Sequence, residues 1–275
     1  MESPSASALI YTLYGLYVRG LGGWVAVADL VALLGALGVG GRAARSAVSR
    51  LSRGGMLVRA ERGGQVGYEL GVEARAVIEE GDRRIFAAGR PADLADGWLL
   101  AVSSVPEDRR DQRHQLRSQL TWLGFGNLGG GVWLAPRRVH ERAIAVLERA
   151  GLATYVDLFE AHPLGEVGDL VRRSWDLTEL EARYRAFLRT SERVLARAPE
   201  ADDREVFVDY TLTVHEWRTL PYLDPGLPAE VLPADWPGTD AARLFAEVVR
   251  RLERPARRWV DDVVSVPAST APGPR

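Results

Sequence analysis

The sequence predicts an α+β protein with an N-terminal winged helix-turn-helix domain, a central ferredoxin-like β-α-β-β-α-β domain and a mostly helical C-terminal domain. Three observations lead to this prediction. Helical patterns near the N-terminus precede a glycine-turned hairpin, strand and helix patterns alternate in the middle, and long helical stripes dominate the end. We expect domains at 8–90, 91–162 and 163–262, followed by a disordered tail at 263–275.

The composition is that of an ordinary globular protein, with 47% hydrophobic and 26% charged residues. The chain has no cysteine, which excludes disulfides and thiolate metal sites. No apolar run approaches the ~18 residues of a membrane span, and the first residues lack the basic start of a secretory signal. We therefore expect a cytoplasmic protein that does not contact a membrane.

Positive charge is distributed unevenly along the chain. Residues 1–90 contain more arginines than acids, whereas the remainder contains more acids than arginines. Within residues 41–70 the only acids are Glu61 and Glu69, against arginines at 42, 45, 50, 53, 59 and 62. Such a local excess of one sign of charge indicates a polyanionic partner.

The N-terminal pattern gives helices at about 8–18, 28–37 and 42–53, with a glycine turn at 38–41. A hairpin follows, with strands at 56–61 and 66–70. The helix at 42–53 is two-faced, since its apolar stripe is formed by Ala44, Ala47, Val48 and Leu51.

This order of elements is typical of a winged helix-turn-helix, whose third helix enters the major groove of DNA. Arginine pairs bidentately with guanine edges, and serine reaches phosphates or bases. The alternative is an arginine-rich helix that is simply solvated. The preceding helix, the turn and the basic hairpin favour DNA binding, with expected contacts from Arg42, Arg45, Ser46, Ser49, Arg50, Arg53, Arg59, Arg62, Gln65 and Tyr68.

The central part reads as a strand from Trp98, a helix at 107–123, two strands within 123–136, a helix at 137–150 and a strand at 153–159. Its GFGNLGG segment resembles a dinucleotide-binding fingerprint only superficially. Because a strand follows it and not a helix, we interpret it as a hairpin turn. The last part predicts helices at 166–174, 176–197, 201–218 and 239–260 around a proline-rich segment at 220–238.

Metal and catalytic sites find little support in the sequence. The four histidines are far apart, and the segment HEWRT has Thr219 where a zinc-protease helix needs its second histidine. We therefore expect no metal, no cofactor and no catalytic residue. The enzymatic alternative is a metal-dependent nuclease, for which Glu107 and Asp108 lie just beyond the first central strand.

Three stretches resemble the PaaX family of repressors of phenylacetate catabolism: LIYTLYGLYVRGLGGWV (9–25), LRSQLTWLGFGNLGGGVWLAP (116–136) and VHEWRTLPYLDPGLPAEVLPADWPG (214–238). The resemblance covers about 8–262. It implies the three domains given above, with a central domain similar to that of small CRISPR-associated nucleases. It also implies a dimer that blocks transcription until an aryl-acyl-CoA thioester, phenylacetyl-CoA in the founding members, releases it.

The third of these stretches holds the best effector candidates, His215, Trp217 and Arg218. An arginine can pair with the phosphates of CoA, and a tryptophan can stack on a ring. The structural alternative, which we favour, is that Trp217 and Trp236 pin the proline-rich loop to the helices and that Arg218 pairs with an acid such as Asp224. Arg113 and Arg117 are a second candidate phosphate contact, with solvation as the simpler interpretation.

The resulting hypothesis is a homodimeric repressor of an aromatic catabolic operon that binds double-stranded operator DNA and is released by an acyl-CoA effector. Affinities for effector and DNA must then be reciprocally coupled. The alternatives are the nuclease and a sensor or scaffold whose winged helix contacts protein. No motif in the sequence names the effector or the operator.

Overall fold

The computed structural model describes residues 4–86 and 92–264. Among these residues the strands form two antiparallel sheets, with orders β1-β3-β2 and β5-β6-β4-β7, and helices make up most of the rest. This confirms the α+β class. The chain divides into two compact units, one holding the chain up to Phe86 with Arg189–Trp217 and the chain from Arg243, the other holding Ala87–Leu188 and Arg218–Ala242.

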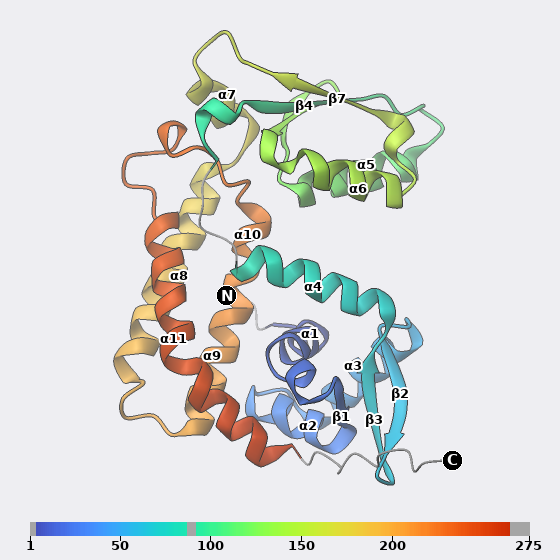
Figure 1. The fold of residues 1–275 in the computed structure, drawn as a ribbon, viewed down its shortest axis with the longest axis vertical. Coiled ribbons are helices and arrows are strands. Elements are labelled where there is room, and N and C mark those ends of the chain that lie inside the picture. The colour runs from blue at the N-terminus through green and yellow to red at the C-terminus, as the bar shows by residue number, and fades with distance from the viewer. Residues whose placement is uncertain (1–3, 87–91, 265–275) are drawn as a thin grey trace, which may run out of the picture. The chain divides into compact units, whose positions relative to one another are not determined.

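The first three helices of the first unit are α1 (Ala6–Leu16), α2 (Val27–Ala36) and α3 (Gly41–Arg53), each within two residues of its predicted start and end (Figure 1). Ser5 caps the N-terminus of α1, because its Oγ accepts a hydrogen bond from the Ala8 amide at 3.3 Å. The three helices pack together through their apolar stripes, which contain Leu9, Ile10, Leu13, Leu30, Leu33, Leu34, Ala44, Ala47, Val48 and Leu51.

A three-stranded sheet joins these helices. The predicted hairpin is formed by β2 (Leu57–Arg62) and β3 (Gln65–Leu70). The sequence did not predict β1 (Trp24–Ala26), which pairs antiparallel with β3 so that Trp24 lies opposite Glu69. Its three residues are too few to show the alternation of a strand.

Helices far along the chain complete the first unit, together with α4 (Val72–Phe86). α9 (Asp203–Trp217) packs on α1, where the Tyr17 hydroxyl lies 2.9 Å from Thr211 Oγ1. The rings of Tyr17 and Phe207 are 5.5 Å apart, and Phe207 contacts Trp259 of α11 (Gly238–Val263) at 4.5 Å. The N-terminal helices therefore share one core with α9 and the last part of α11.

The second unit contains a sheet of four antiparallel strands, with α5 and α6 on one face (Figure 1). β4 lies between β6 and β7, and β5 pairs with β6 as a hairpin across Gly130 and Gly131. This confirms the hairpin interpretation of GFGNLGG. The elements are β4 (Trp98–Ser103), α5 (Arg110–Leu123), β5 (Gly126–Gly129), β6 (Val132–Pro136), α6 (His140–Arg149) and β7 (Val156–Ala161).

The other face of this sheet is covered in part by α7 (Val167–Ser174) and by Trp175. Gly126 permits this contact, since a Cβ there would lie 2.6 Å from Ser174 Cβ. Trp98 packs on Trp175 with ring centroids 6.3 Å apart. The chain continues into α8 (Leu177–Arg197) and, after α9, into the short α10 (Leu220–Leu223) of the proline-rich segment.

α11 reaches Val263, so the predicted tail at 263–275 begins at the end of a helix. The remainder of that tail, 265–275, and the predicted domain limit at 90/91 lie outside the described residues. Within the described part of the chain, none of the helices combines the length and the apolar character that a membrane span needs.

Candidate nucleic-acid interface

The turn before α3 sets the direction of that helix. Gly38 has φ +84°, a left-handed conformation that favours glycine. The amides of Gly38 and Val39 donate to the carbonyls of Gly35 and Leu34 at 3.0 and 2.9 Å, which satisfies the end of α2. α3 then begins after Gly40 and contacts both α1 and α2. The sequence GVGG thus joins two packed helices by a tight turn.

The outer face of α3 carries all six of its predicted DNA contacts. Its inner side buries Ala44 and Ala47 almost completely. No acidic residue lies within α3, and its last turn carries two arginines, which suits the negative end of the helix dipole. The exposed polar side chains of the outer face are Arg42, Arg45, Ser46, Ser49, Arg50 and Arg53. We call this set the α3 basic face.

Among the described residues, the arginines of the α3 basic face have hydrogen bonds to neutral groups only. Arg50 Nη2 donates to Ser7 Oγ at 2.7 Å, and Arg45 Nη1 donates weakly to the Gly41 carbonyl at 3.4 Å. Among residues 4–86 and 92–264, none of the four arginines forms an ion pair. Their positive charge is therefore available to an external anion.

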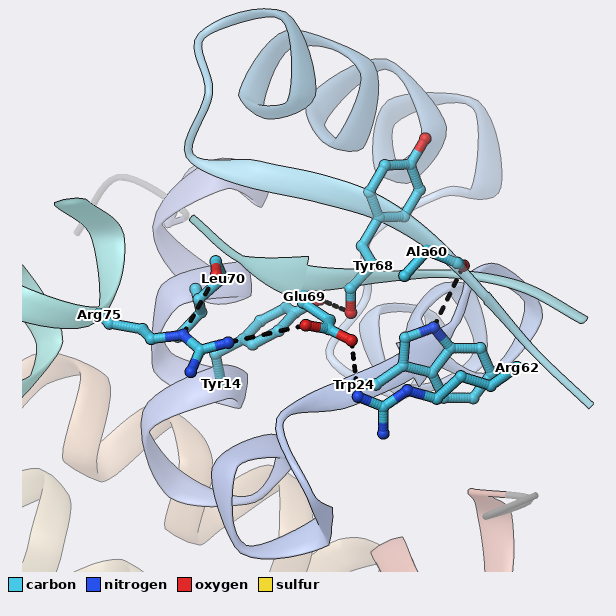
Figure 2. Close-up of polar contacts among 8 residues, drawn as sticks. All are labelled: Tyr14, Trp24, Ala60, Arg62, Tyr68, Glu69, Leu70 and Arg75. Carbon is cyan, nitrogen blue, oxygen red and sulfur yellow. Dashed lines mark hydrogen bonds and ion pairs between the residues drawn. The ribbon is translucent and has the colours of Figure 1, made fainter. Parts of the chain in front are cut away.

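The hairpin distributes its four predicted contacts over both faces of the sheet. Arg59 lies directly opposite Tyr68 in the β2–β3 ladder, so both side chains share one face. Arg62 lies opposite Gln65 and both belong to the other face. Figure 2 shows the Tyr68 ring on the opposite side of β3 from Arg62.

The Arg62 side chain is held in place by contacts with Trp24 and Glu69 (Figure 2). Its guanidinium lies 5.8 Å from the centroid of the Trp24 ring, and its Nη2 donates to Glu69 Oε1 at 2.6 Å. The Trp24 ring occupies the space beside Gly67, where a Cβ would lie only 2.4 Å from the indole. Its Nε1 donates to the Ala60 carbonyl at 3.2 Å. Arg62, one of the six arginines in residues 41–70, is thus paired with a carboxylate of the same hairpin.

Glu69 also lies near a second arginine. Arg75 Nη2 is 3.6 Å from Glu69 Oε2, and Arg75 Nε donates to the Leu70 carbonyl at 3.3 Å. The Tyr14 hydroxyl donates to the Tyr68 carbonyl at 2.9 Å, and burial raises the pKa of that hydroxyl. These contacts fix the base of the hairpin on α1 and α4.

The effector candidates lie at the end of α9. His215 Nδ1 is 2.9 Å from Thr12 Oγ1. Trp217 is 1% exposed, stacks on Phe245 with ring centroids 4.6 Å apart, and donates from Nε1 to the Ile85 carbonyl at 3.0 Å. Arg218 follows the last residue of α9 and is partly buried. Trp217 is therefore buried and packed on Phe245, and the effector role of these residues stays a prediction.

Trp236 and Asp224, which belong to the third motif, both contact Tyr184 of α8. Trp236 meets Tyr184 edge to face at 5.9 Å, and the Tyr184 hydroxyl donates to Asp224 Oδ2 at 2.7 Å. Burial raises the pKa of Tyr184. Trp236 thus contacts a helix, as the structural alternative expects.

The acids considered for a nuclease, Glu107 and Asp108, are exposed in the turn before α5. In the described part of the chain, no group of three or more histidine, aspartate or glutamate side chains is arranged to hold a metal ion.

Exposed arginines on a helix beside a hairpin, without ion pairs among the described residues, form a surface suited to a polyanion. Comparison with known proteins shows the family to which the chain belongs. Family models match residues 5–74 (PaaX-like protein), 91–170 (PaaX protein central Cas2-like domain) and 175–262 (PaaX-like protein C-terminal domain). The chain is 30% identical to "Transcriptional repressor PaaX" of Escherichia coli (strain K12) over 280 residues, which covers 98% of this chain and 87% of that protein.

The chain belongs to the PaaX family of transcriptional repressors, and it is a transcriptional regulator and not an enzyme. This confirms the family resemblance, and the nuclease alternative finds no support. Among solved structures, it is similar to "Uncharacterized protein Rv0674 from Mycobacterium tuberculosis", with a TM-score of 0.60 and 22% identity over 94% of this chain and 100% of that one. That likeness concerns the fold alone.

Sequence reasoning missed the residues that support the hairpin. Trp24 and Gly67 come from different strands, and nothing local in either segment shows that they meet. The signal that could have found them is the pairing of a large aromatic residue with a glycine in a strand, which marks a close approach of another group.

Proposed function

We propose that this protein represses transcription by placing α3 in the major groove of operator DNA while the β2–β3 hairpin contacts the flanking backbone. The observation that carries the proposal is the α3 basic face, whose four arginines are exposed and unmatched by carboxylates in the described chain. Arginine is the side chain that most often reads guanine in the major groove, and serines at 46 and 49 can reach phosphates or bases.

The arrangement of elements supports the finer fold assignments. Two helices, a tight turn, a third helix and a hairpin joined by β1 are the parts of a winged helix. The sheet of the second unit has the order β7-β4-β6-β5, so the domain's fourth strand is followed by its first, third and second. Two helices cover one face of this sheet, as in a ferredoxin-like domain. The matched ranges of the three family models support domains near 8–90, 91–162 and 163–262.

The proposal includes a homodimer. Two copies of α3 would meet successive major grooves about 34 Å apart on a roughly palindromic site. Each protomer with ~4 phosphate-neutralising arginines would give a slope of log affinity against log salt near −3.6.

An acyl-CoA thioester would release the repressor from DNA. This part rests on the family, whose relative from E. coli is a transcriptional repressor, and phenylacetyl-CoA is the first compound to test. Release requires that the effector bind the DNA-free conformation more tightly than the DNA-bound one.

A mobility-shift experiment with DNA upstream of the neighbouring operon tests the function. We expect a retarded complex in excess nonspecific DNA, a footprint with two half-sites, and loss of the complex when phenylacetyl-CoA is added. Persistence of the complex with every acyl-CoA would contradict the effector part alone. Absence of any sequence-preferring complex would contradict the repressor function.

A further inference from the structure

The second unit contains a pocket of about 470 Å³ on the sheet face that α5 and α6 do not cover. Its floor consists of apolar side chains from three neighbouring strands, Leu100, Leu128 and Leu134. Its wall is the chain between β7 and α7 together with Leu170 of that helix. Its lining residues include neither those of the α3 basic face nor the effector candidates at 215–218.

The pocket is open because α7 covers only part of this sheet face. α7 contacts β5, and Trp175 and Val171 fill the space over Trp98. Beyond that cover, Phe159 of β7 remains 51% exposed and Leu164 is fully exposed. An apolar concavity of this kind, beside exposed apolar side chains, is typical of a binding site.

The rim of the pocket carries both signs of charge, but one cation stands out. Asp169 is paired with Arg172, which lies outside the lining. Arg173 lines the pocket and takes part in no ion pair among the described residues. Glu166 and His162 complete the polar rim. A leucine floor with Arg173 at the rim suits a ligand that combines an apolar group with electron-rich oxygens.

The size of the pocket limits the ligand. Small-molecule sites range over about 300–1,000 Å³, and a cavity near 150 Å³ already holds benzene. The 470 Å³ pocket thus accommodates an aryl or branched alkyl group with several linking atoms.

We propose that this pocket binds the aryl or alkyl acyl group of a small carboxylate or thioester, with the acyl oxygen or an attached anion facing Arg173. The inference rests on the proposed function in one respect, because the ligand would be the effector that releases DNA. It assigns the acyl group to the central sheet and leaves the residues at 215–218 to packing.

Titration calorimetry on the full chain tests the assignment, with phenylacetyl-CoA, phenylacetate and free CoA as probes. We expect phenylacetyl-CoA to bind and Arg173→Ala to weaken that binding about 10-fold, since a charge-assisted hydrogen bond is lost. The matched control is Arg183→Ala, because Arg183 is an exposed arginine of the same unit that pairs with Glu179 and does not line the pocket. Equal affinities of the two variants would overturn the assignment of Arg173.

A second variant tests the floor. Ala161→Leu, at a partly buried position in the lining, would fill the pocket and should lower the affinity at least 10-fold with an unchanged melting temperature. Unchanged affinity in Ala161→Leu would overturn the pocket. A change in oligomeric mass with ligand binding retained would overturn it too, since the face would then be a subunit contact.

The failure of the pocket and the failure of the proposed function give different results. Suppose that phenylacetyl-CoA binds the wild type, that Ala161→Leu abolishes this binding, and that the compound does not dissociate the protein from DNA. The pocket assignment is then supported and the effector role is contradicted. If phenylacetyl-CoA dissociates DNA equally from the wild type, Arg173→Ala and Ala161→Leu, the proposed function is supported and the pocket assignment is contradicted. If none of the three probes binds, the pocket assignment fails, while sequence-preferring DNA binding still decides the repressor function.

Discussion

The arginines of α3 and those of the C-terminal helices are used in different ways. On α8 and α11, several arginines are paired with carboxylates on the same or a neighbouring element, as in Arg183–Glu179, Arg185–Glu181, Arg197–Asp209, Arg250–Glu247 and Arg258–Asp203. On α3, Arg42, Arg45, Arg50 and Arg53 have no such partner among the described residues. Both regions are arginine-rich helices, but ion pairs with carboxylates occur on α8 and α11 and, among the described residues, not on α3.

The difference indicates what each set of charges does. An exposed ion pair stabilises a fold by about 0–1 kcal/mol, so the paired arginines contribute modestly to folding. Arg42 with Arg45, and Arg50 with Arg53, are like charges three residues apart on one helix, which destabilises the helix by about 0.2–0.5 kcal/mol per pair. The repulsion among the α3 arginines opposes folding, and a bound polyanion would neutralise it. DNA binding therefore explains why these arginines lie together. Substitutions in the two regions should therefore affect different measurements.

The largest expected effect is on folding, in the helical region. Trp217→Ala removes a buried ring that stacks on Phe245 and should lower the free energy of unfolding by about 3–5 kcal/mol. Urea denaturation followed by circular dichroism measures it, with the more exposed Trp236→Ala as the control. Unchanged stability together with lost effector binding would make Trp217 a ligand contact.

Arg197→Ala tests what a paired arginine contributes to stability when its carboxylate partner is buried. Asp209 is 6% exposed and accepts from Arg197 Nε at 2.6 Å, whereas the Arg197 side chain itself is 64% exposed. Leaving the carboxylate without its partner should cost about 2 kcal/mol of unfolding free energy, with DNA affinity unchanged. Arg193→Ala, one turn earlier, should change neither quantity, because Arg193 contacts only the Arg189 carbonyl among the described residues.

Arg45→Ala tests the opposite region. Loss of one arginine contact to DNA should weaken operator binding by about 1–3 kcal/mol, while the free energy of unfolding stays the same or rises slightly. Fluorescence anisotropy with labelled operator and a melting curve on the same sample measure both. Loss of stability with unchanged DNA affinity would place Arg45 among the structural arginines.

Arg53→Ala should have the smallest effect, visible mainly in the salt dependence. Arg53 lies in the last turn of α3, where a phosphate contact is expected. Its removal should change the slope of log affinity against log salt from about −3.6 to about −2.7 per protomer. Binding titrations at four salt concentrations measure the slope. A slope that stays the same would show that Arg53 does not neutralise a phosphate.

The sequence predicted the elements that local periodicity defines. The stripe Ala44, Ala47, Val48 and Leu51 located α3 to within a residue, and the glycines at 63 and 64 located the hairpin. The exposed positions of α3 followed directly from that stripe. The α+β class and the family were also predictable, because the three motifs lie in order along the chain.

The rest depends on contacts between segments far apart in the sequence. β1 exists because it pairs with β3, some 40 residues later, and neither segment alone indicates the register. The packing of α9 on α1 through Tyr17 and Thr211 likewise has no local signature. The Arg62–Glu69 pair could not be predicted either, because the register places Gln65 opposite Arg62 and the two side chains meet along the same face of the sheet.

The central claim is that the α3 basic face binds operator DNA, and a double substitution tests it most directly. Arg45→Ala/Arg50→Ala and Arg193→Ala/Arg197→Ala remove the same charge from α3 and from α8. Anisotropy titrations in 150 mM salt should show operator affinity reduced at least 100-fold for the α3 pair and within twofold of wild type for the α8 pair. Equal affinities of the two variants, both folded by circular dichroism, would contradict the claim.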